Sequence, residues 1–154
     1  LAALAEHPQR SPIVLTNSLG DKVSRHLATL ELAAEVAVLG DTRQYEMDPS
    51  WPHRFLHPEL GEIQVWPVDT LHSVDLRRPA YHQALVNEAA DGTHLAVVAD
   101  TFSLPGAMPL VMDVPFLLLR TAYTPAWCID VVAAHPLGQV LDDLADLPGA
   151  LDGL

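Results

Sequence analysis

The residues best suited to hold a ligand lie where a short apolar run gives way to a helical pattern, near the start of the chain. Residues 13–16 predict a short buried strand, residues 17–20 a tight turn, and the following residues a helix with Asp21 as its N-cap. This order of strand, turn and helix commonly holds a phosphate in α/β proteins, because the amide groups at a helix N-terminus point toward the anion. Lysine occurs once in the chain, at the mouth of this helix. The ligand-binding candidates in this stretch are Asn17, Ser18, Gly20, Lys22 and Ser24.

Polar residues also follow the other predicted strands. Three of these strands cover apolar runs at residues 35–39, 95–99 and 114–119. Ligands of parallel α/β sheets bind beyond the carboxyl ends of the strands, so Asp41, Asp100 and Arg120 are further ligand-binding candidates. Asp69 follows another predicted strand, and aspartates at strand ends are able to gather around one cation. The alternative, which we favour, is that each aspartate caps the turn that follows it.

Two histidines, His53 and His57, stand four residues apart, a spacing that metal ligands use on helices. Pro52 and Pro58 bracket the pair, and the sequence dictates no third ligand. We therefore favour loop histidines that pack beside aromatic neighbours, and we predict no metal site.

A second group of residues has the ingredients of an acid–base or nucleophile set: His72, Ser73, Asp75 and His82. The chain has no Gly-x-Ser-x-Gly motif, so we do not favour a hydrolase. Cys128, between Trp127 and Ile129, is predicted to be a buried thiol and not a nucleophile. The catalytic residues therefore remain unassigned.

The elements that must position these residues form one predicted domain. The chain has 154 residues, 49% of them hydrophobic, which is enough for a sizeable core. Apolar strands that alternate with helical patterns predict a three-layer α/β/α domain with a mainly parallel sheet of five or six strands. We expect an N-terminal arm at residues 1–11, a long loop at 43–61 and a frayed tail at 148–154.

Further elements are predicted from periodicity. A strand is expected at residues 62–68, and helices at 79–90, 126–134 and 137–147. Residues 128–132 are equally compatible with a helix and with a further strand.

The charge of the chain excludes some classes of partner. Twenty acidic residues against eight basic ones give a formal net charge of −12, which repels nucleic acids and anionic membrane surfaces. The apolar runs are shorter than the roughly 20 residues that a membrane-spanning helix needs, so we expect no membrane insertion. A single cysteine fits a reducing compartment, and we expect a cytoplasmic protein.

The strand-end pattern resembles the ParA/MinD-like branch of P-loop ATPases, which includes the bacterial tyrosine kinases. Ile13-Val14-Leu15-Thr16-Asn17 looks like the first strand of that family, and Val36-Ala37-Val38-Leu39-Gly40-Asp41 like the second. Leu95-Ala96-Val97-Val98-Ala99-Asp100 is similar to its middle strand, and Phe116-Leu117-Leu118-Leu119-Arg120-Thr121 to the strand after that. The resemblance implies that Asp41 assists the attacking water or substrate and that Asp100 supports Mg²⁺.

The phosphate loop departs from the pattern of that family. A working loop needs several glycines and a lysine directly followed by serine or threonine. This chain offers one glycine, and Val23 separates Lys22 from Ser24. Asp21 also places a carboxylate where a triphosphate would lie. The resemblance therefore implies a relative that has lost nucleotide hydrolysis, without ATP or Mg²⁺ as a cofactor.

Two functions follow from these observations. We favour a non-catalytic P-loop-like domain that acts as an interaction or scaffold module in a larger assembly, with a protein partner or as a homo-oligomer. Its aromatic candidates for a partner surface, which are also candidates for the core, are Tyr45, Trp51, Trp66 and Tyr123. The alternative is a small nucleotide-binding protein or enzyme whose site lies at the C-terminal ends of the sheet strands.

Overall fold

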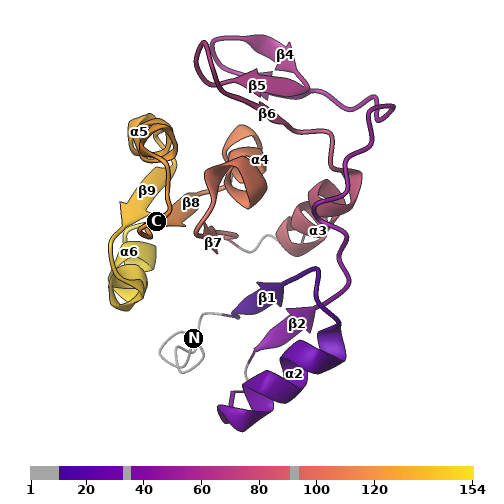
Figure 1. Cartoon of the computed structure of the whole chain (residues 1–154), viewed down its shortest axis with the longest axis vertical. Coiled ribbons are helices and arrows are strands. Elements are labelled where there is room, and N and C mark those ends of the chain that lie inside the picture. The colour runs from indigo at the N-terminus through magenta and orange to yellow at the C-terminus, as the bar shows by residue number, and fades with distance from the viewer. Residues whose placement is uncertain (1–10, 33–35, 91–93) are drawn as a thin grey trace. The chain divides into compact units, whose positions relative to one another are not determined.

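The computed structural model describes residues 11–32, 36–90 and 94–154 (Figure 1). The chain forms two units, residues 1–46 and residues 47–154, and each of them is compact. The predicted N-terminal arm at residues 1–11 lies outside the described residues except for Ser11.

The first unit is a β–α–β arrangement. Strand β1 (Ile13–Leu15) pairs in parallel with β2 (Ala37–Leu39), and helix α2 (Gly20–Thr29) connects them. Leu27 of the helix and Val36 before β2 are buried. The predicted strand, turn and helix are therefore confirmed. Asp21 as N-cap was wrong, because the helix begins two residues earlier, at Gly20, and Leu19 is its N-cap.

The second unit begins with two antiparallel hairpins. Strand β3 (Phe55–His57) pairs with β4 (Gly61–Ile63), and β5 (Val65–Pro67) pairs with β6 (Ser73–Asp75). Gly61 has φ of 72°, a conformation that glycine adopts without strain.

These hairpins correct two predictions. The region predicted as a loop at 43–61 contains β3, and the single strand predicted at 62–68 is divided between β4 and β5. The division falls at Gln64, whose side-chain amide donates to the carbonyl oxygens of Trp51 (2.7 Å) and His53 (2.9 Å). These bonds hold the incoming loop against the point where one hairpin ends and the next begins.

The second unit continues with a three-stranded parallel sheet. Strand β8 (Phe116–Leu119) lies between β7 (Val97–Ala99) and β9 (Gly138–Leu141), and its first three residues are fully buried. The helices of this unit are α3 (Pro79–Ala89), the π-helical turn η1 (Phe102–Gly106), α4 (Ala107–Val111), α5 (Ala126–Ala134), the 3₁₀ turn η2 (Leu144–Asp146) and α6 (Leu147–Asp152). No helix in the described ranges has the length and apolar character needed to cross a bilayer.

The predicted parallel sheet of five or six strands is wrong. The described strands form one parallel pair, two antiparallel hairpins and one parallel sheet of three strands. The cause is the segment that follows the first unit, where short strands fold back on their neighbours through tight turns instead of crossing over a helix.

Of the helices predicted in the C-terminal half of the chain, two are confirmed and one is wrong. Helices at 79–90 and 126–134 are confirmed within one residue, which decides between helix and strand for residues 128–132. The helix predicted at 137–147 is wrong, because β9 forms there and completes the parallel sheet, and the tail predicted as frayed contains α6.

The first unit depends on a close approach of two glycines, which gives a test of its packing. A Cβ atom added to Gly40 would overlap the backbone N and Cα of Gly20. We expect Gly40→Ala to destabilise this unit by about 1–3 kcal/mol, as overpacking does. Urea unfolding followed through the amide signals of residues 37–44 measures the effect.

Gly149→Ala is the control, because nothing lies within 4 Å of a Cβ at that position and alanine suits a helix. Equal unfolding midpoints for Gly40→Ala and the unaltered chain would contradict the packing described here.

Candidate functional site

The predicted phosphate turn after β1 is closed by the chain itself. The backbone amide of Asp41 donates to the carbonyl oxygen of Ser18 (3.0 Å), and the amide of Thr42 donates to that of Thr16 (3.3 Å). The hydroxyl of Thr42 donates to the same Thr16 oxygen at 3.0 Å. The segment after β2 therefore lies directly against the turn and bonds to it.

Asn17 fastens these two segments with its side chain. Its Oδ1 accepts from the backbone amide of Gln44 (2.9 Å) and from the hydroxyl of Thr42 (3.3 Å). The amide of Ser18 donates to the hydroxyl oxygen of Thr16 at 3.1 Å, so it is used within the turn. Within the turn region, the amide of Ser18 is therefore engaged, and the amide of Lys22 donates to the carbonyl oxygen of Leu19 at 3.0 Å, so neither is available to a phosphate.

Lys22 and Ser24 lie in α2 but do not form a pair. Two residues apart on an α-helix are rotated by about 200°, so their side chains leave the helix on nearly opposite sides. Lys22 is exposed and Ser24 is half-buried, in agreement with that rotation. One phosphate is not able to contact both groups as it does in a working P-loop.

Asp100 and Arg120 follow neighbouring parallel strands and share one edge of the sheet in the second unit. Arg120 forms an ion pair of 2.8 Å with Asp142, which follows β9. The carboxylate of Asp100 accepts from the hydroxyl of Thr101 at 3.1 Å. Asp41, with φ of 53°, belongs to the first unit, where it lies beside Ser18.

An ordered turn connects β5 to β6, and its hydrogen bonds were not predicted from the sequence. The carboxylate of Asp69 accepts three hydrogen bonds there, from the amides of Leu71 and His72 (2.7 Å each) and from Nδ1 of His72 (2.7 Å). The bond from His72, followed by the amide of Leu71, lowers the pKa of Asp69. The interpretation of Asp69 as a turn cap is therefore confirmed.

An aromatic contact with helix α5 also holds this turn. The His72 ring stacks on the indole of Trp127 in α5, with ring centroids 4.5 Å apart and planes 13° apart. Trp127 in turn meets the buried ring of Phe102 edge-on, at 5.9 Å. Sequence spacing gives no sign of this contact, because residues 72 and 127 are far apart in the chain.

The ingredients of an acid–base set, which the sequence did not favour as a site, have other partners in the structure. Asp75 binds Arg77 through two hydrogen bonds, of 2.6 and 3.0 Å, and these bonds lower the pKa of its carboxyl group. Arg77 also donates to the carbonyl oxygen of Pro49 at 3.1 Å, so the pair fixes the start of this unit.

The predicted packing of loop histidines is confirmed for His53, which contacts Trp51 and Phe55, whereas His57 lies in β3 and not in a loop. His53 stacks on Trp51 at 4.9 Å, and its ring lies 4.5 Å from that of His82 in α3. His57 instead meets Trp66 at 5.2 Å. Among the residues with described positions, no group of three metal-binding side chains is close enough to hold an ion.

Cys128 is buried, with 3% of its surface exposed, and burial raises the pKa of its thiol. A protonated, enclosed thiol is a poor nucleophile. The prediction of a buried Cys128 thiol is therefore confirmed.

Comparison with known proteins gives no relative: no family model, curated protein or solved structure matches the chain.

The closed turn makes a prediction about nucleotides. We expect millimolar ATP or ADP with Mg²⁺ to leave the thermal unfolding midpoint unchanged, because the amides of the turn are engaged and Asp21 opposes a triphosphate. A ligand present at 100 times its Kd would add about 2.7 kcal/mol and raise the midpoint by several degrees. A saturable rise that needs both nucleotide and Mg²⁺ would contradict the prediction.

The histidine cluster predicts a dependence of stability on pH. Burial, and then repulsion from His53, lowers the pKa of His82. The unfolded chain therefore binds a proton at higher pH than the folded chain, so the free energy of unfolding is highest above about pH 6.5 and falls as pH drops through the folded pKa.

His82→Phe keeps an aromatic ring beside Trp51 and should flatten this fall in urea unfolding between pH 7.5 and 5. The same replacement at exposed His26 serves as the control. An unchanged pH profile for His82→Phe would contradict the assignment.

Proposed function

We propose that this chain is a non-catalytic protein-interaction module, and that Leu71 is an anchor of its contact surface. The observation that carries the proposal is that the Leu71 side chain is 87% exposed on a turn that several interactions hold rigid. Exposed leucines are common on mobile loops and mean little there. A leucine on a braced turn calls for a different explanation.

The bracing comes first from hydrogen bonds. The Asp69 carboxylate holds the amides on both sides of the Leu71 peptide unit, those of Leu71 and His72. The amides of Val68 and Asp69 both donate to the carbonyl oxygen of His72, at 3.0 and 3.2 Å. Both ends of the turn are thus bonded to each other.

Stacking of His72 on Trp127 then ties the turn to α5. A side chain presented in this way loses little conformational freedom when a partner covers it, which improves affinity without additional contacts. Leucine is rarer among interface hot spots than Trp, Tyr and Arg, but hot spots share full desolvation in a pocket surrounded by less important contacts, which a partner would give to Leu71.

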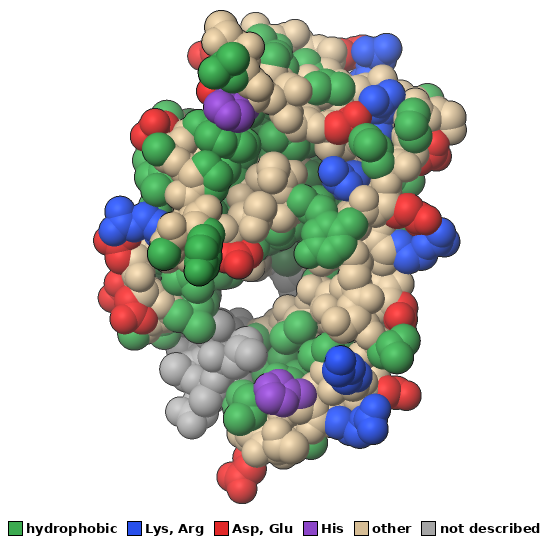
Figure 2. All heavy atoms as spheres, in the orientation of Figure 1, with side chains coloured by type: hydrophobic (Ala, Val, Ile, Leu, Met, Phe, Trp, Pro, Cys, Tyr) green, Lys and Arg blue, Asp and Glu red, His purple; other side chains and the backbone are tan. Residues whose placement is uncertain are grey.

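A further exposed apolar side chain lies on the same hairpin as this turn. Val65 in β5 is 39% exposed. Hydrophobic and charged side chains alternate over this part of the surface (Figure 2). This composition fits an interface with an apolar centre and a polar rim.

Charge directs the proposal toward protein partners. With a net charge of −12, the chain repels polyanions, and the basic side chains visible in Figure 2 are dispersed among acidic ones. We place the module in the cytoplasm, because its one cysteine is a free thiol. A P-loop-like ancestry remains a prediction; the closed turn supports the loss of nucleotide chemistry that it implied.

Site-specific crosslinking tests the proposal. A photoreactive benzoyl-phenylalanine in place of Leu71 should give one dominant protein adduct in cells that express the chain, whereas the same group at exposed Gln83 in α3 should not. The adduct is identified by mass spectrometry, and the purified partner is then titrated against variants. A second copy of this chain as the adduct also supports an interaction module.

We expect Leu71→Ser to weaken binding of that partner by about 10- to 100-fold, in the range of interface hot spots. Leu144→Ser, at another exposed leucine, should change it by less than about 3-fold. Asp69→Asn keeps Leu71 but loosens its turn, so it should weaken binding by an intermediate factor and speed hydrogen exchange at the amides of Leu71 and His72. Equal binding by Leu71→Ser and the unaltered chain would refute the proposal.

A further inference from the structure

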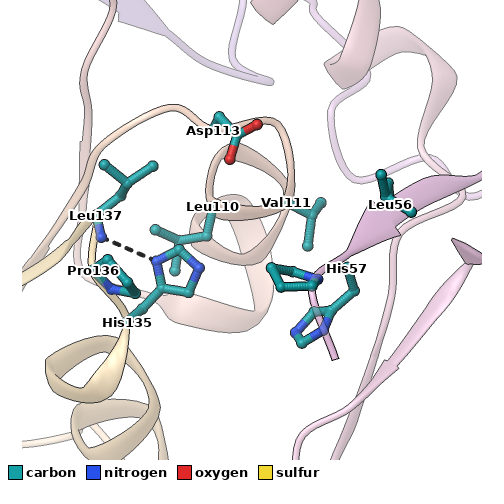
Figure 3. Close-up of a pocket in the computed structure, with 9 residues that line it drawn as sticks. Leu56, His57, Leu110, Val111, Asp113, His135, Pro136 and Leu137 are labelled. Carbon is teal, nitrogen blue, oxygen red and sulfur yellow. Dashed lines mark hydrogen bonds between the residues drawn. The ribbon is translucent and has the colours of Figure 1, made fainter. Parts of the chain in front are cut away.

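A small pocket in the second unit has the chemistry of a ligand site and is separate from the Leu71 turn. Its volume is about 140 Å³, and it is lined by residues of β3, of the C-terminal end of α4 and of the connection from α5 to β9. Figure 3 shows the imidazoles of His57 and His135 on two sides of this pocket, with Leu110 and Val111 of α4 along its wall. Both histidines are half-buried.

The hydrogen bonds of these two histidines fix which ring nitrogen carries the proton. The backbone amide of Glu59 donates to Nδ1 of His57, and the amide of Leu137 donates to Nδ1 of His135, both at 3.2 Å. An amide is only able to donate, so each Nδ1 must be an acceptor without a hydrogen. The neutral ring then carries its hydrogen on Nε2.

One indole contacts both imidazole rings and fixes their orientation. Buried Trp66 meets the rings of His57 and His135 edge-on, at centroid distances of 5.2 and 6.3 Å. In Figure 3 the nitrogen of His135 that is bonded to Leu137 lies on the far side of the ring, and the other nitrogen lies on the side facing His57. His135 therefore presents its Nε2–H to the pocket from a ring of fixed orientation, and His57 lines the pocket with its tautomer fixed in the same way.

Protonation does not change this arrangement readily. Burial, and then repulsion from His57, lowers the pKa of His135, although Asp113 opposes that shift. A second proton on either ring would go to Nδ1, where the amide donor already lies. The lowered pKa of His135 favours its neutral ring, which keeps the hydrogen on Nε2.

These features exclude a metal ion and an anion as the ligand. A metal ligand needs a lone pair on Nε2 and therefore a hydrogen on Nδ1, which the two amides oppose. Asp113, at the end of α4, adds a carboxylate to the lining, and it repels anions. The rest of the lining is apolar, including buried Leu110.

We propose that this pocket binds a small neutral ring compound that carries one hydrogen-bond acceptor, with the acceptor directed at the imidazole N–H groups of His57 and His135. The size fits, because an apolar cavity of about 150 Å³ accommodates benzene. The apolar walls cover the ring, and the N–H donors distinguish a ligand with an acceptor from a plain hydrocarbon.

Phenol, benzene and benzoate are probes that separate these requirements. We titrate each into ¹⁵N-labelled protein at pH 7.5 and follow the amides of Glu59 and Leu137, which bond to the two imidazoles. Phenol should shift both amides saturably and bind about 3- to 10-fold more tightly than benzene, the factor expected for one hydrogen bond. Benzoate should cause no saturable shift. Equal affinity for all three probes, or no saturable shift with phenol, would overturn the proposal.

Two variants complete the test. Val111→Phe should fill the pocket and abolish the phenol shifts, and Val86→Phe, on the exposed side of α3, is the matched control. Asp113→Asn removes the charge and keeps a residue that tolerates the positive φ of 58° at this position. It should raise the affinity for benzoate by about 10-fold or more. Benzoate binding that is equally absent with Asp113 and with asparagine would refute the role of Asp113 in excluding anions.

Discussion

The second unit depends on a continuous row of aromatic rings in its interior. Trp127 meets Phe102, Phe102 meets Trp66 at 5.4 Å, and Trp66 meets His57 and His135. Phe102 is completely buried and Trp66 nearly so. Edge-on aromatic pairs are directional, so each ring fixes the angle of the next as well as its distance.

The two proposed sites lie at opposite ends of this row. At one end, His72 stacks on Trp127 and holds the turn that exposes Leu71. At the other end, Trp66 orients the two imidazoles of the pocket. Both sites thus derive their rigidity from the same buried rings, and neither requires a residue from the ends of the parallel strands, where ligands of α/β sheets usually bind.

What the sequence predicts well in this chain is local. The helices at 79–89 and 126–134 follow from periodicity and from prolines at their starts, and the first unit follows from an apolar run, a turn and an amphipathic helix. Pairing between strands is not local. Residues 138–141 have a pattern compatible with a helix, yet they form β9 because Phe116 and Leu119 of β8 offer an unpaired edge there.

The candidate sites show the same difference between local patterns, which the sequence predicts, and contacts between distant residues, which it does not. Asn17, Ser18 and Asp41 are candidate ligand-binding residues, but Ser18 and Asp41 bond to each other, and Asn17 bonds to Thr42 and Gln44. The set of His72 with Asp75 failed because Arg77 takes the carboxylate, while Asp69, three residues before His72, binds its ring. The contact of His72 with Trp127 depends on tertiary packing, which residue spacing does not encode.

The polarity of hydrogen bonds explains why the predicted site differs from the sites in the structure. In the first unit, backbone amides of the segment after β2 donate to the carbonyl oxygens of Thr16 and Ser18 and to Oδ1 of Asn17, so this segment is bonded directly to the phosphate turn. In the pocket, backbone amides donate to Nδ1 of His57 and His135, and this turns the opposite side of each ring into a donor. The same group, an amide N–H, closes one site and gives the other its specificity. Residue types alone would assign phosphate binding to the first and metal binding to the second, because they do not record which partner donates.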